Sequence, residues 1–259
     1  MTQRTHEPTT CAPGARAISA LYPSAAASMR DLLVFSCTRS AKDRTRLYRS
    51  LGKLGIDRYY FDEDNTAGLS ARYNKFFEEH AGGSEIAILA HDDVSIEDVF
   101  VREKLSEGAK KFAIQGLAGA ATFQLQLEHP QTMWIRAPKD HLSGAVEHVY
   151  EDGRTLWSVY GPVPKRCAVL DGAFLAVDLS AIGSLRFDEQ FTFHFYDLDF
   201  CLEAARHSLS LGTVNVHANH ASHGEFTCRD FFDAQERFRT KWQAILGAPS
   251  PGPLHPPFP

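Results

Sequence analysis

The 259-residue chain has no long apolar run: no stretch reaches the roughly 18 uninterrupted apolar residues that a membrane-spanning helix requires. The sequence therefore predicts no membrane span. Its five cysteines are widely spaced, and no C-x-x-C pair occurs among them. Isolated thiols are typical of a reducing compartment, so we expect a cytoplasmic protein.

An excess of positive charge is also missing. The chain has 27 Lys and Arg residues against 32 Asp and Glu residues, for a formal net charge of -5. Its basic residues are scattered, apart from a short group at Lys42, Arg44, Arg46 and Arg49. This balance argues against nucleic acid and against a polybasic membrane surface as partners.

Two phosphate-binding loops are absent. No G-x-G-x-x-G follows the first expected strand, which argues against a dinucleotide-binding protein. No G-x-x-x-x-G-K-[ST] occurs, which argues against a P-loop enzyme. Residues 1–30 lack the apolar core of a signal peptide and are expected to form a flexible leader. The Pro-rich residues 247–259 are expected to form a tail without regular structure.

The first part of the chain shows a β-α alternation. Short apolar runs predict strands, and amphipathic segments between them predict helices. The expected strands cover residues 31–37, 56–61, 85–91 and 111–119, and the expected helices 40–55, 68–80 and 95–108. In the third helix, Ser95 is the expected N-cap, with Glu97 and Asp98 in the first turn. The alternation predicts an α/β fold with a doubly wound, mostly parallel sheet, in which ligands lie off the carboxyl ends of the strands.

The second part predicts a mixed lobe. Residues 145–161 form two alternating runs around Asp152-Gly153, which is a hairpin signal. A strand over 166–179, interrupted at Asp171-Gly172, is followed by a helix over 196–208, a strand over 212–219 and a helix over 227–246. Nothing marks a linker between the two parts, so we expect one domain over residues 31–246.

The segment "ILAHDDV" places polar residues at the end of an apolar strand. If strand geometry continues, His91 and Asp93 share one side and Asp92 faces the other. A carboxylate with a polar neighbour can bind a hard divalent ion such as Mg²⁺ or Mn²⁺. The alternative is a helix cap or a solvated turn, which is the more common use of Asp before a helix.

The segment "FHFYDLDF" places Asp197 and Asp199 in the first turn of an expected helix. There the helix dipole favours an ionised carboxylate, which could act as a general base if a hydroxyl group approaches it. The alternative is an acid that only stabilises the helix. His194 could equally be a core or capping histidine.

Two further segments carry candidate ligands. "VHANHASHG" contains His217, His220 and His223, one of which could complete a metal shell begun by Asp93. "FDEDNTAG" follows the second strand, and Asp62 or Asp64 could accept hydrogen bonds from a base or ribose beside the turn-forming Asn65 and Gly68.

The succession of these motifs resembles the family 2 type GT-A glycosyltransferases, and most closely the glycosyltransferase-like domain associated with streptomycin biosynthesis. The resemblance covers residues 31–242, and its most specific parts are "HDDV" and "FHFYDLDF". It implies a GT-A type fold with a nucleotide-binding half over 31–119 and an acceptor and catalytic half over 120–246. It also implies a nucleotide-sugar donor carrying UDP or a similar nucleotide, and a carbohydrate or other hydroxyl acceptor.

The resemblance implies roles for particular residues. Asp93 would bind the divalent cation, Mn²⁺ or Mg²⁺, and Asp197 would be the base of an inverting transfer. This chain has His91 where the family carries its first acidic residue. The remaining implied positions are metal ligands His220 and His223, nucleotide-binding residues Thr38, Asp62, Asn65 and Asp92, and sugar or acceptor residues Asp171, Gly172, His194 and Asp199.

Two alternatives remain open. A sugar-nucleotide hydrolase or a nucleotidyltransferase could share the fold, although "SCTRSAKDR" lacks the glycines usual in the nucleotidyltransferase loop. A non-catalytic nucleotide- or sugar-binding module is favoured by His91 at an otherwise acidic position.

Overall fold

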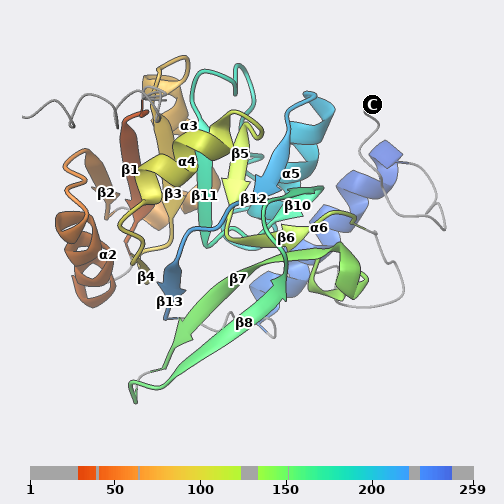
Figure 1. Ribbon diagram of the computed structural model, residues 1–259. Helices are drawn as coiled ribbons and strands as arrows, with labels where there is room; N and C mark the ends of the chain where they lie inside the picture. The colour runs from red at the N-terminus through yellow and green to blue at the C-terminus, as the bar shows by residue number, and fades with distance from the viewer. Residues whose placement is uncertain are drawn as a thin grey trace, which may run out of the picture.

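The computed structural model of the protein describes residues 29–38, 41–63, 65–123, 134–150, 152–221 and 228–246 (Figure 1). Its strands form one seven-stranded sheet and one six-stranded sheet. Most of the expected leader, residues 1–28, and the whole expected tail, 247–259, lie outside the described residues.

The seven-stranded sheet has the order β2-β1-β3-β11-β5-β12-β9. Its strands are β1 (Leu32–Cys37), β2 (Tyr59–Asp62), β3 (Ile86–Ala90), β5 (Ile114–Gly116), β9 (Lys165–Cys167), β11 (Phe174–Asp178) and β12 (Leu211–Thr213). Strands β2, β1 and β3 are parallel, as the β-α alternation predicts. Strands β5 and β12 continue in that direction, whereas β11 and β9 run against it.

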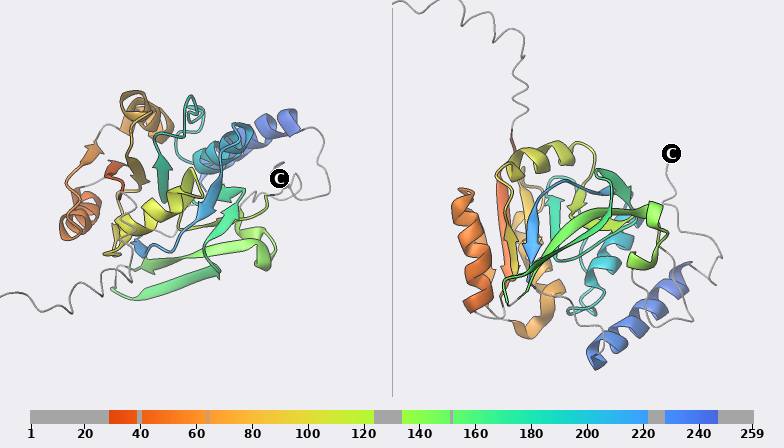
Figure 2. Two further views of the ribbon diagram at one scale, coloured as in Figure 1. Left: turned by 45° about the horizontal axis from the view of Figure 1, so that its top comes forward. Right: turned by 60° about the horizontal axis from the view of Figure 1, so that its bottom comes forward.

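Helices cover both faces of this sheet. They are α2 (Ala41–Lys53), α3 (Gly68–His80), α4 (Val101–Ala109), α5 (Tyr196–Arg206) and α6 (Arg229–Leu246), with a short 3-10 turn η1 (Asn65–Ala67) before α3. Helices α3 and α4 lie on opposite faces of the sheet (Figures 1 and 2). The expectation of an α/β fold with helices around a mostly parallel central sheet is therefore confirmed. None of the described helices is long and apolar enough to cross a membrane.

The centre of the sheet differs from the prediction because it contains strand β11. The alternation suggests that the third and fourth strands of the chain are neighbours, but β11 lies between β3 and β5 and is antiparallel to both. All five of its residues, "FLAVD", are buried, which suits a strand covered on both faces. Because β11 starts beside the end of β3, it brings residues from the second half of the chain to "HDDV".

Residues 94–96 form a strand, so the prediction that Ser95 caps a helix is wrong. Strand β4 (Val94–Ile96) pairs with the second sheet, and α4 begins only at Val101. Asp98 precedes the helix, and its carboxylate accepts hydrogen bonds from the backbone N–H groups of Phe100 and His217. The strand forms because β13 supplies a pairing partner that local helix signals cannot reveal.

The second sheet contains the predicted hairpin. Its strands are β4, β6 (Ala118–Ala120), β7 (Leu142–Val149), β8 (Thr155–Gly161), β10 (Val169–Leu170) and β13 (Ala218–His220), and the 3-10 turns η2 (Trp134–Arg136) and η3 (Lys139–His141) precede β7. The β7–β8 hairpin extends below the rest of the described chain in Figure 1. Three predicted strands are split between elements: 111–119 into β5 and β6, 166–179 into β9, β10 and β11, and 212–219 into β12 and β13. Chain segments thus pass from one sheet to the other.

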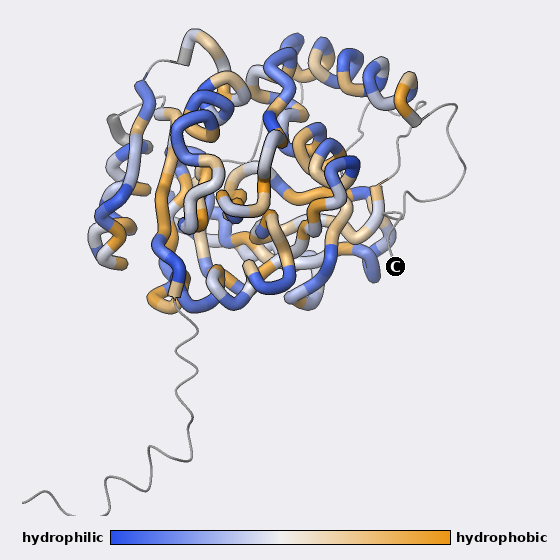
Figure 3. The backbone as a smooth tube through the Cα atoms, turned by 90° about the horizontal axis from the view of Figure 1, so that it is seen from above, coloured by the Kyte–Doolittle hydropathy of each residue, from blue (hydrophilic) through white to orange (hydrophobic). Residues whose placement is uncertain are grey.

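The core lies between the central strands and their helices. Leu33, Ile88, Leu89 and Phe174 are at most 1% exposed, and replacing such a leucine by alanine typically costs about 2–5 kcal/mol of stability. The helices alternate between hydrophilic and hydrophobic segments along the tube in Figure 3, as amphipathic helices with one face on a core do.

Candidate functional site

The polar segment after β3 forms a tight turn. The N–H of Val94 donates a hydrogen bond to the carbonyl of His91 at 3.2 Å, which reverses the chain between β3 and β4. The N–H of His91 donates to the carbonyl of Ala173 at 3.0 Å and so extends the β3–β11 ladder by one bond. The end of β3 therefore lies against residues 171–173 of the second half.

His91, Asp93 and His220 form a group that could bind a metal ion. One possible ligand atom from each residue lies within 4.8 Å of the others. His220 reaches this position because β13 pairs with β4, which places His220 opposite Val94. Its Nε2 atom lies 3.1 Å from an oxygen of Asp93, a carboxylate whose side chain is only 6% exposed.

This group fits a divalent cation. Nε2 of His220 is buried, and no described residue makes a hydrogen bond with it. A buried imidazole nitrogen facing a buried carboxylate is costly unless a proton or a cation lies between them. Two imidazoles and one carboxylate are a normal ligand set for a first-row divalent metal, with further positions left for water and phosphate oxygens.

The ring of His91 is oriented by Tyr196. The hydroxyl group of Tyr196 donates its single hydrogen to the carbonyl of Gly172 at 2.8 Å, so it must accept from Nε2 of His91 at 2.9 Å. In the neutral ring Nδ1 is then the nitrogen with the lone pair. Such hydrogen bonds behind a metal-binding histidine are a common way of setting its tautomer.

Asp197 lies at the start of α5, next to Tyr196. Its two carboxylate oxygens accept hydrogen bonds from the N–H groups of Gly172 and Leu198, both at 2.9 Å. Burial, with a smaller contribution from the negative charge of Asp171, raises the pKa of Asp197 to about 7. A carboxyl group that titrates near neutral pH can accept or release a proton under ordinary conditions.

Gly172 permits this arrangement through its lack of a side chain. A Cβ atom at position 172 would lie 2.5 Å from the hydroxyl oxygen of Tyr196 and 2.7 Å from Cβ of Asp197. The Asp171-Gly172 interruption therefore lets α5 approach the start of β11 closely. Gly172 and Tyr196 connect His91, a member of the possible metal-binding group, to Asp197 through a chain of hydrogen bonds.

A cavity of about 320 Å³ opens beside His91. Phe193 forms part of its wall, is 41% exposed and lies over the ring of His91, with 5.8 Å between ring centroids. Gly68 also lines the cavity; it has a φ of +79°, and a Cβ atom there would lie 2.7 Å from Thr192. The lining residues are Cys37, Thr66, Gly68, Leu69, His91, Asp92, Thr192 and Phe193.

The residues predicted to bind the nucleotide lie along the same edge of the sheet. The N–H of Thr38, just after β1, donates to the carbonyl of Asp62 at the end of β2. Asp62 also lies 3.5 Å from the guanidinium of Arg72 on α3. Asn65 begins the turn η1 that leads into α3, and Asp92 is 1% exposed in the wall of the cavity.

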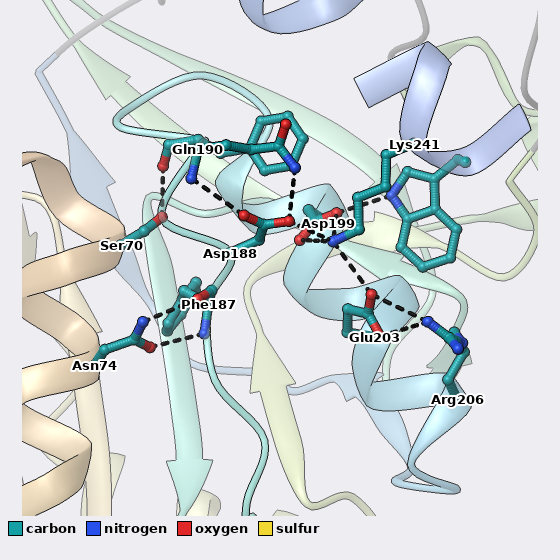
Figure 4. A network of polar contacts seen from close by, with 11 residues as sticks. Ser70, Asn74, Phe187, Asp188, Gln190, Asp199, Glu203, Arg206 and Lys241 are labelled. Atoms are coloured by element: carbon teal, nitrogen blue, oxygen red, sulfur yellow. Dashed lines mark hydrogen bonds and ion pairs between the residues drawn. The ribbon is translucent and has the colours of Figure 1, made fainter. Parts of the chain in front are cut away.

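Two of the predicted sugar or acceptor residues, Asp199 and His194, contact α6. The carboxylate of Asp199 has no exposed surface and accepts hydrogen bonds from Lys241 and from the indole of Trp242, both at 2.9 Å (Figure 4). His194 lies 3.5 Å from the thiol of Cys228 and packs edge-on against Phe231. Asp171 and Gly172 instead lie beside Asp197. The predicted ligand His223 is outside the described residues.

Sequence reasoning missed Tyr196 and Phe193, and it placed His91 beside Asp93 without naming it as a metal ligand. Tyr196 is part of "YDLD", so the sequence shows that it adjoins Asp197. Its hydrogen bond to His91, 105 positions away in the chain, cannot be predicted from the sequence. His91 and Asp93 do come together, although through a turn and not through the alternation of a continuing strand.

No protein-family model and no curated protein sequence matches this chain. Among solved structures, the chain is similar to GalNAc-T7, whose crystal structure contains UDP, GalNAc and Mn²⁺, with a TM-score of 0.52 and 10% sequence identity. The similarity covers 81% of this chain and 48% of that one, so this chain spans about half the length of GalNAc-T7. At this identity the likeness shows the fold alone, and the expected GT-A type fold is confirmed.

Two further structures are more distant. They are A197 from STIV, with a TM-score of 0.45, 14% identity, and 74% of this chain and 86% of that chain covered, and the inositol-1-phosphate CTP transferase from T. maritima, with a TM-score of 0.33, 12% identity, and 82% and 77% covered. Both TM-scores are too low to carry an argument about this chain.

Proposed function

We propose that this chain is a glycosyltransferase of the family 2, streptomycin-biosynthesis-associated type, which moves a sugar from a nucleoside-diphosphate donor to a hydroxyl group of an acceptor. One observation carries the proposal. The possible metal-binding group of His91, Asp93 and His220 is joined by hydrogen bonds through Tyr196 and Gly172 to Asp197. The fold supports it, since GalNAc-T7 has the same type of fold and its structure contains UDP and Mn²⁺.

The cation site would lie on the donor side. We propose that His91, Asp93 and His220 hold Mn²⁺ or Mg²⁺, with His223 as a further candidate ligand. A divalent cation bound there would neutralise the negative charge that builds on the departing nucleoside diphosphate. Mg²⁺ prefers oxygen ligands, so two imidazoles should favour Mn²⁺.

Asp197 would act as the general base. With a pKa of about 7, a substantial fraction of the group is ionised at neutral pH and can accept the proton of an acceptor hydroxyl. The N–H groups of Gly172 and Leu198 hold both oxygens in place. One base that activates a hydroxyl for attack opposite the leaving group is sufficient for an inverting transfer, so no second catalytic carboxylate is required.

The two halves of the chain would bind different substrates, the donor in the first half and the acceptor in the second. The cavity beside His91 and the residues at the ends of β1 and β2 would receive the nucleotide, which assigns donor binding to Thr38, Asp62, Asn65 and Asp92 in residues 31–119. Residues 120–246 would supply the acceptor side, where Asp171 and Gly172 adjoin Asp197.

The proposal can be tested with a panel of nucleotide sugars and Mn²⁺. We expect slow hydrolysis of one donor without acceptor, since water can replace the acceptor hydroxyl. Asp93→Ala should remove metal-dependent binding of the nucleoside diphosphate, measured by calorimetry. Asp57→Asn is the matched control, because Asp57 is exposed and lies outside the site, and this variant should behave as the wild type.

The outcomes separate the alternatives. Release of inorganic pyrophosphate from a nucleoside triphosphate and a sugar phosphate would identify a nucleotidyltransferase. Binding of a nucleotide sugar without any turnover would identify a binding module. Hydrolysis that survives Asp93→Ala unchanged would contradict the assignment of the cation site.

A further inference from the structure

Strand β8 has an unusual edge. It pairs with β7 over residues 155–161, and no other described strand pairs with it. One row of its backbone N–H and C=O groups therefore has no strand partner within the described part of the chain. Open edges of this kind are templates for pairing with another strand.

The side chains of β8 are unusually apolar for such an edge. Leu156 is 53% exposed, Trp157 48% and Val159 73%. Natural edge strands are normally protected by lysine, proline or inward-pointing charges. The segment "TLWSVYG" contains no charged residue and no proline.

The order of these side chains is self-complementary about Ser158. If two copies of β8 pair in antiparallel fashion with Ser158 facing Ser158, Trp157 faces Val159 of the other copy and Leu156 faces Tyr160. Residues directly opposite on antiparallel strands point to the same face, so each contact joins two apolar groups. Aromatic residues opposite aliphatic ones are among the favourable cross-strand pairs.

Charge does not oppose this pairing. In the same register Arg154 faces Pro162 and Asp152 faces Pro164, so no like charges meet at the ends of the strands. Asp152 and Arg154 already form an ion pair with each other within one hairpin. The hairpin also extends below the rest of the described chain in Figure 1.

We propose that β8 is a dimerisation strand, and that two copies of this chain join their second sheets by antiparallel β8–β8 pairing across a two-fold axis at Ser158. The interface is isologous, so it closes with two copies and does not continue into a fibre. This assignment is independent of the glycosyltransferase proposal, since it uses no residue of the cation site or of the cavity.

Sedimentation velocity and light scattering of the full chain test the dimer. The expected mass is twice the chain mass of 28.8 kDa at micromolar concentration. Val159→Lys places a charge opposite Trp157 of the other copy and should reduce the mass to that of one chain. The matched control is Val99→Lys, because Val99 is also 73% exposed and lies before α4, away from β8.

Cross-linking tests the register. In a chain whose Cys11 and Cys228 are replaced by serine, the Ser158→Cys thiols should form a disulfide between copies under mild oxidation. Opposite residues have Cα atoms about 4.5–5.5 Å apart, which is within disulfide reach. Thr155→Cys in the same background should not cross-link, because its two copies would be separated by six positions, or about 20 Å at the strand rise.

A monomeric wild-type chain would overturn the proposal, as would a dimer that Val159→Lys leaves intact. A mass above two chains would contradict the closed two-fold arrangement. Equal cross-linking of Ser158→Cys and Thr155→Cys would contradict the register. Because these measurements require no substrate, they are unaffected by any failure of the proposed enzymatic function.

Discussion

Asp197 and Asp199 stand two positions apart in the first turn of α5, yet their surroundings differ completely. Asp197 faces the Asp171-Gly172 turn before β11. Its hydrogen-bond partners among the described residues are the N–H groups of Gly172 and Leu198, and the negative charge of Asp171 lies nearby. Asp199 faces α6, where Lys241 and Trp242 bind its carboxylate (Figure 4). Burial raises the pKa of both, to about 7 and about 6.

This comparison separates the acid that we propose as the general base from a structural one. An acid held by neutral N–H groups beside a second acid can exchange its proton at the site. A fully buried acid that is paired with a partly buried lysine, as Asp199 is with Lys241, cannot lose that partner without a large cost. The two faces of one helix thus carry two different uses of the same residue type, and the predictions below challenge that division.

Asp197→Asn should have the largest effect on activity. Loss of a general base typically lowers turnover by about two to four orders of magnitude. Single-turnover measurement of donor consumption with acceptor would show this, and nucleoside-diphosphate binding should remain at its wild-type level. Unchanged turnover would remove Asp197 from the reaction, whereas Asp57→Asn should leave both quantities unchanged.

Lys241→Met should have the largest effect on stability. It would leave Asp199, Asp188 and Glu203, all within 3.2 Å of the lysine nitrogen, without their shared cation. Breaking a buried ion pair typically costs about 3–5 kcal/mol of unfolding free energy. Urea denaturation measures this loss, and Lys110→Met is the control, because the pair of Lys110 and Glu107 is exposed and such pairs contribute little to stability. Equal losses in the two variants would refute a structural role for Asp199.

Gly172→Ala should have a smaller effect on stability. This effect should arise from contacts with Tyr196 and Asp197 and should not involve Asp199. The added methyl group would collide with Tyr196 and Asp197, and overpacking of this kind costs about 1–3 kcal/mol. We also expect weaker Mn²⁺ binding, since Tyr196 orients His91. Gly52→Ala provides the comparison: no atom lies within 4 Å of its added Cβ in α2, and the change should stabilise the helix by up to about 1 kcal/mol.

The pH dependence of stability tests the raised pKa of Asp197 directly. Because the pKa of Asp197 is raised from 3.8 to about 7 in the folded protein, the folded state retains this proton between those values while the unfolded state releases it. The contribution of Asp197 to stability is therefore present below about pH 4 and is lost as the pH rises to 7. Relative to Asp197→Asn, the wild type should lose unfolding free energy between about pH 4 and pH 7. Parallel curves for the two proteins would show that the pKa of Asp197 is not raised.

Many of the strands and helices could be predicted from the sequence. The apolar runs of β1 and β3 and the amphipathic α3 are local patterns, and hairpin β7–β8 has its turn signal at Asp152-Gly153. The insertion of β11 between β3 and β5 could not be predicted, because it depends on which strands pair and not on the strand pattern itself. Strand β4 was mistaken for a helix start for the same reason.

The site was predictable only in part. Polar residues after the third strand indicated His91 and Asp93, and the first turn of an expected helix indicated Asp197. The structure joins these residues through Tyr196 and Gly172. Asp199 has a structural role because it binds Lys241, which lies 42 positions further along the chain. The segment "YDLD" alone therefore cannot distinguish the two acids. The distinction comes from packing between α5 and α6.

Binding of Mn²⁺ in the presence of a nucleoside diphosphate tests the central claim most directly. Titration calorimetry or the paramagnetic signal of free Mn²⁺ should show one site per chain, which Asp93→Ala and His220→Ala both abolish and Asp199→Asn leaves intact if the variant is folded. Mn²⁺ binding that persists at full stoichiometry without both Asp93 and His220 would contradict the account.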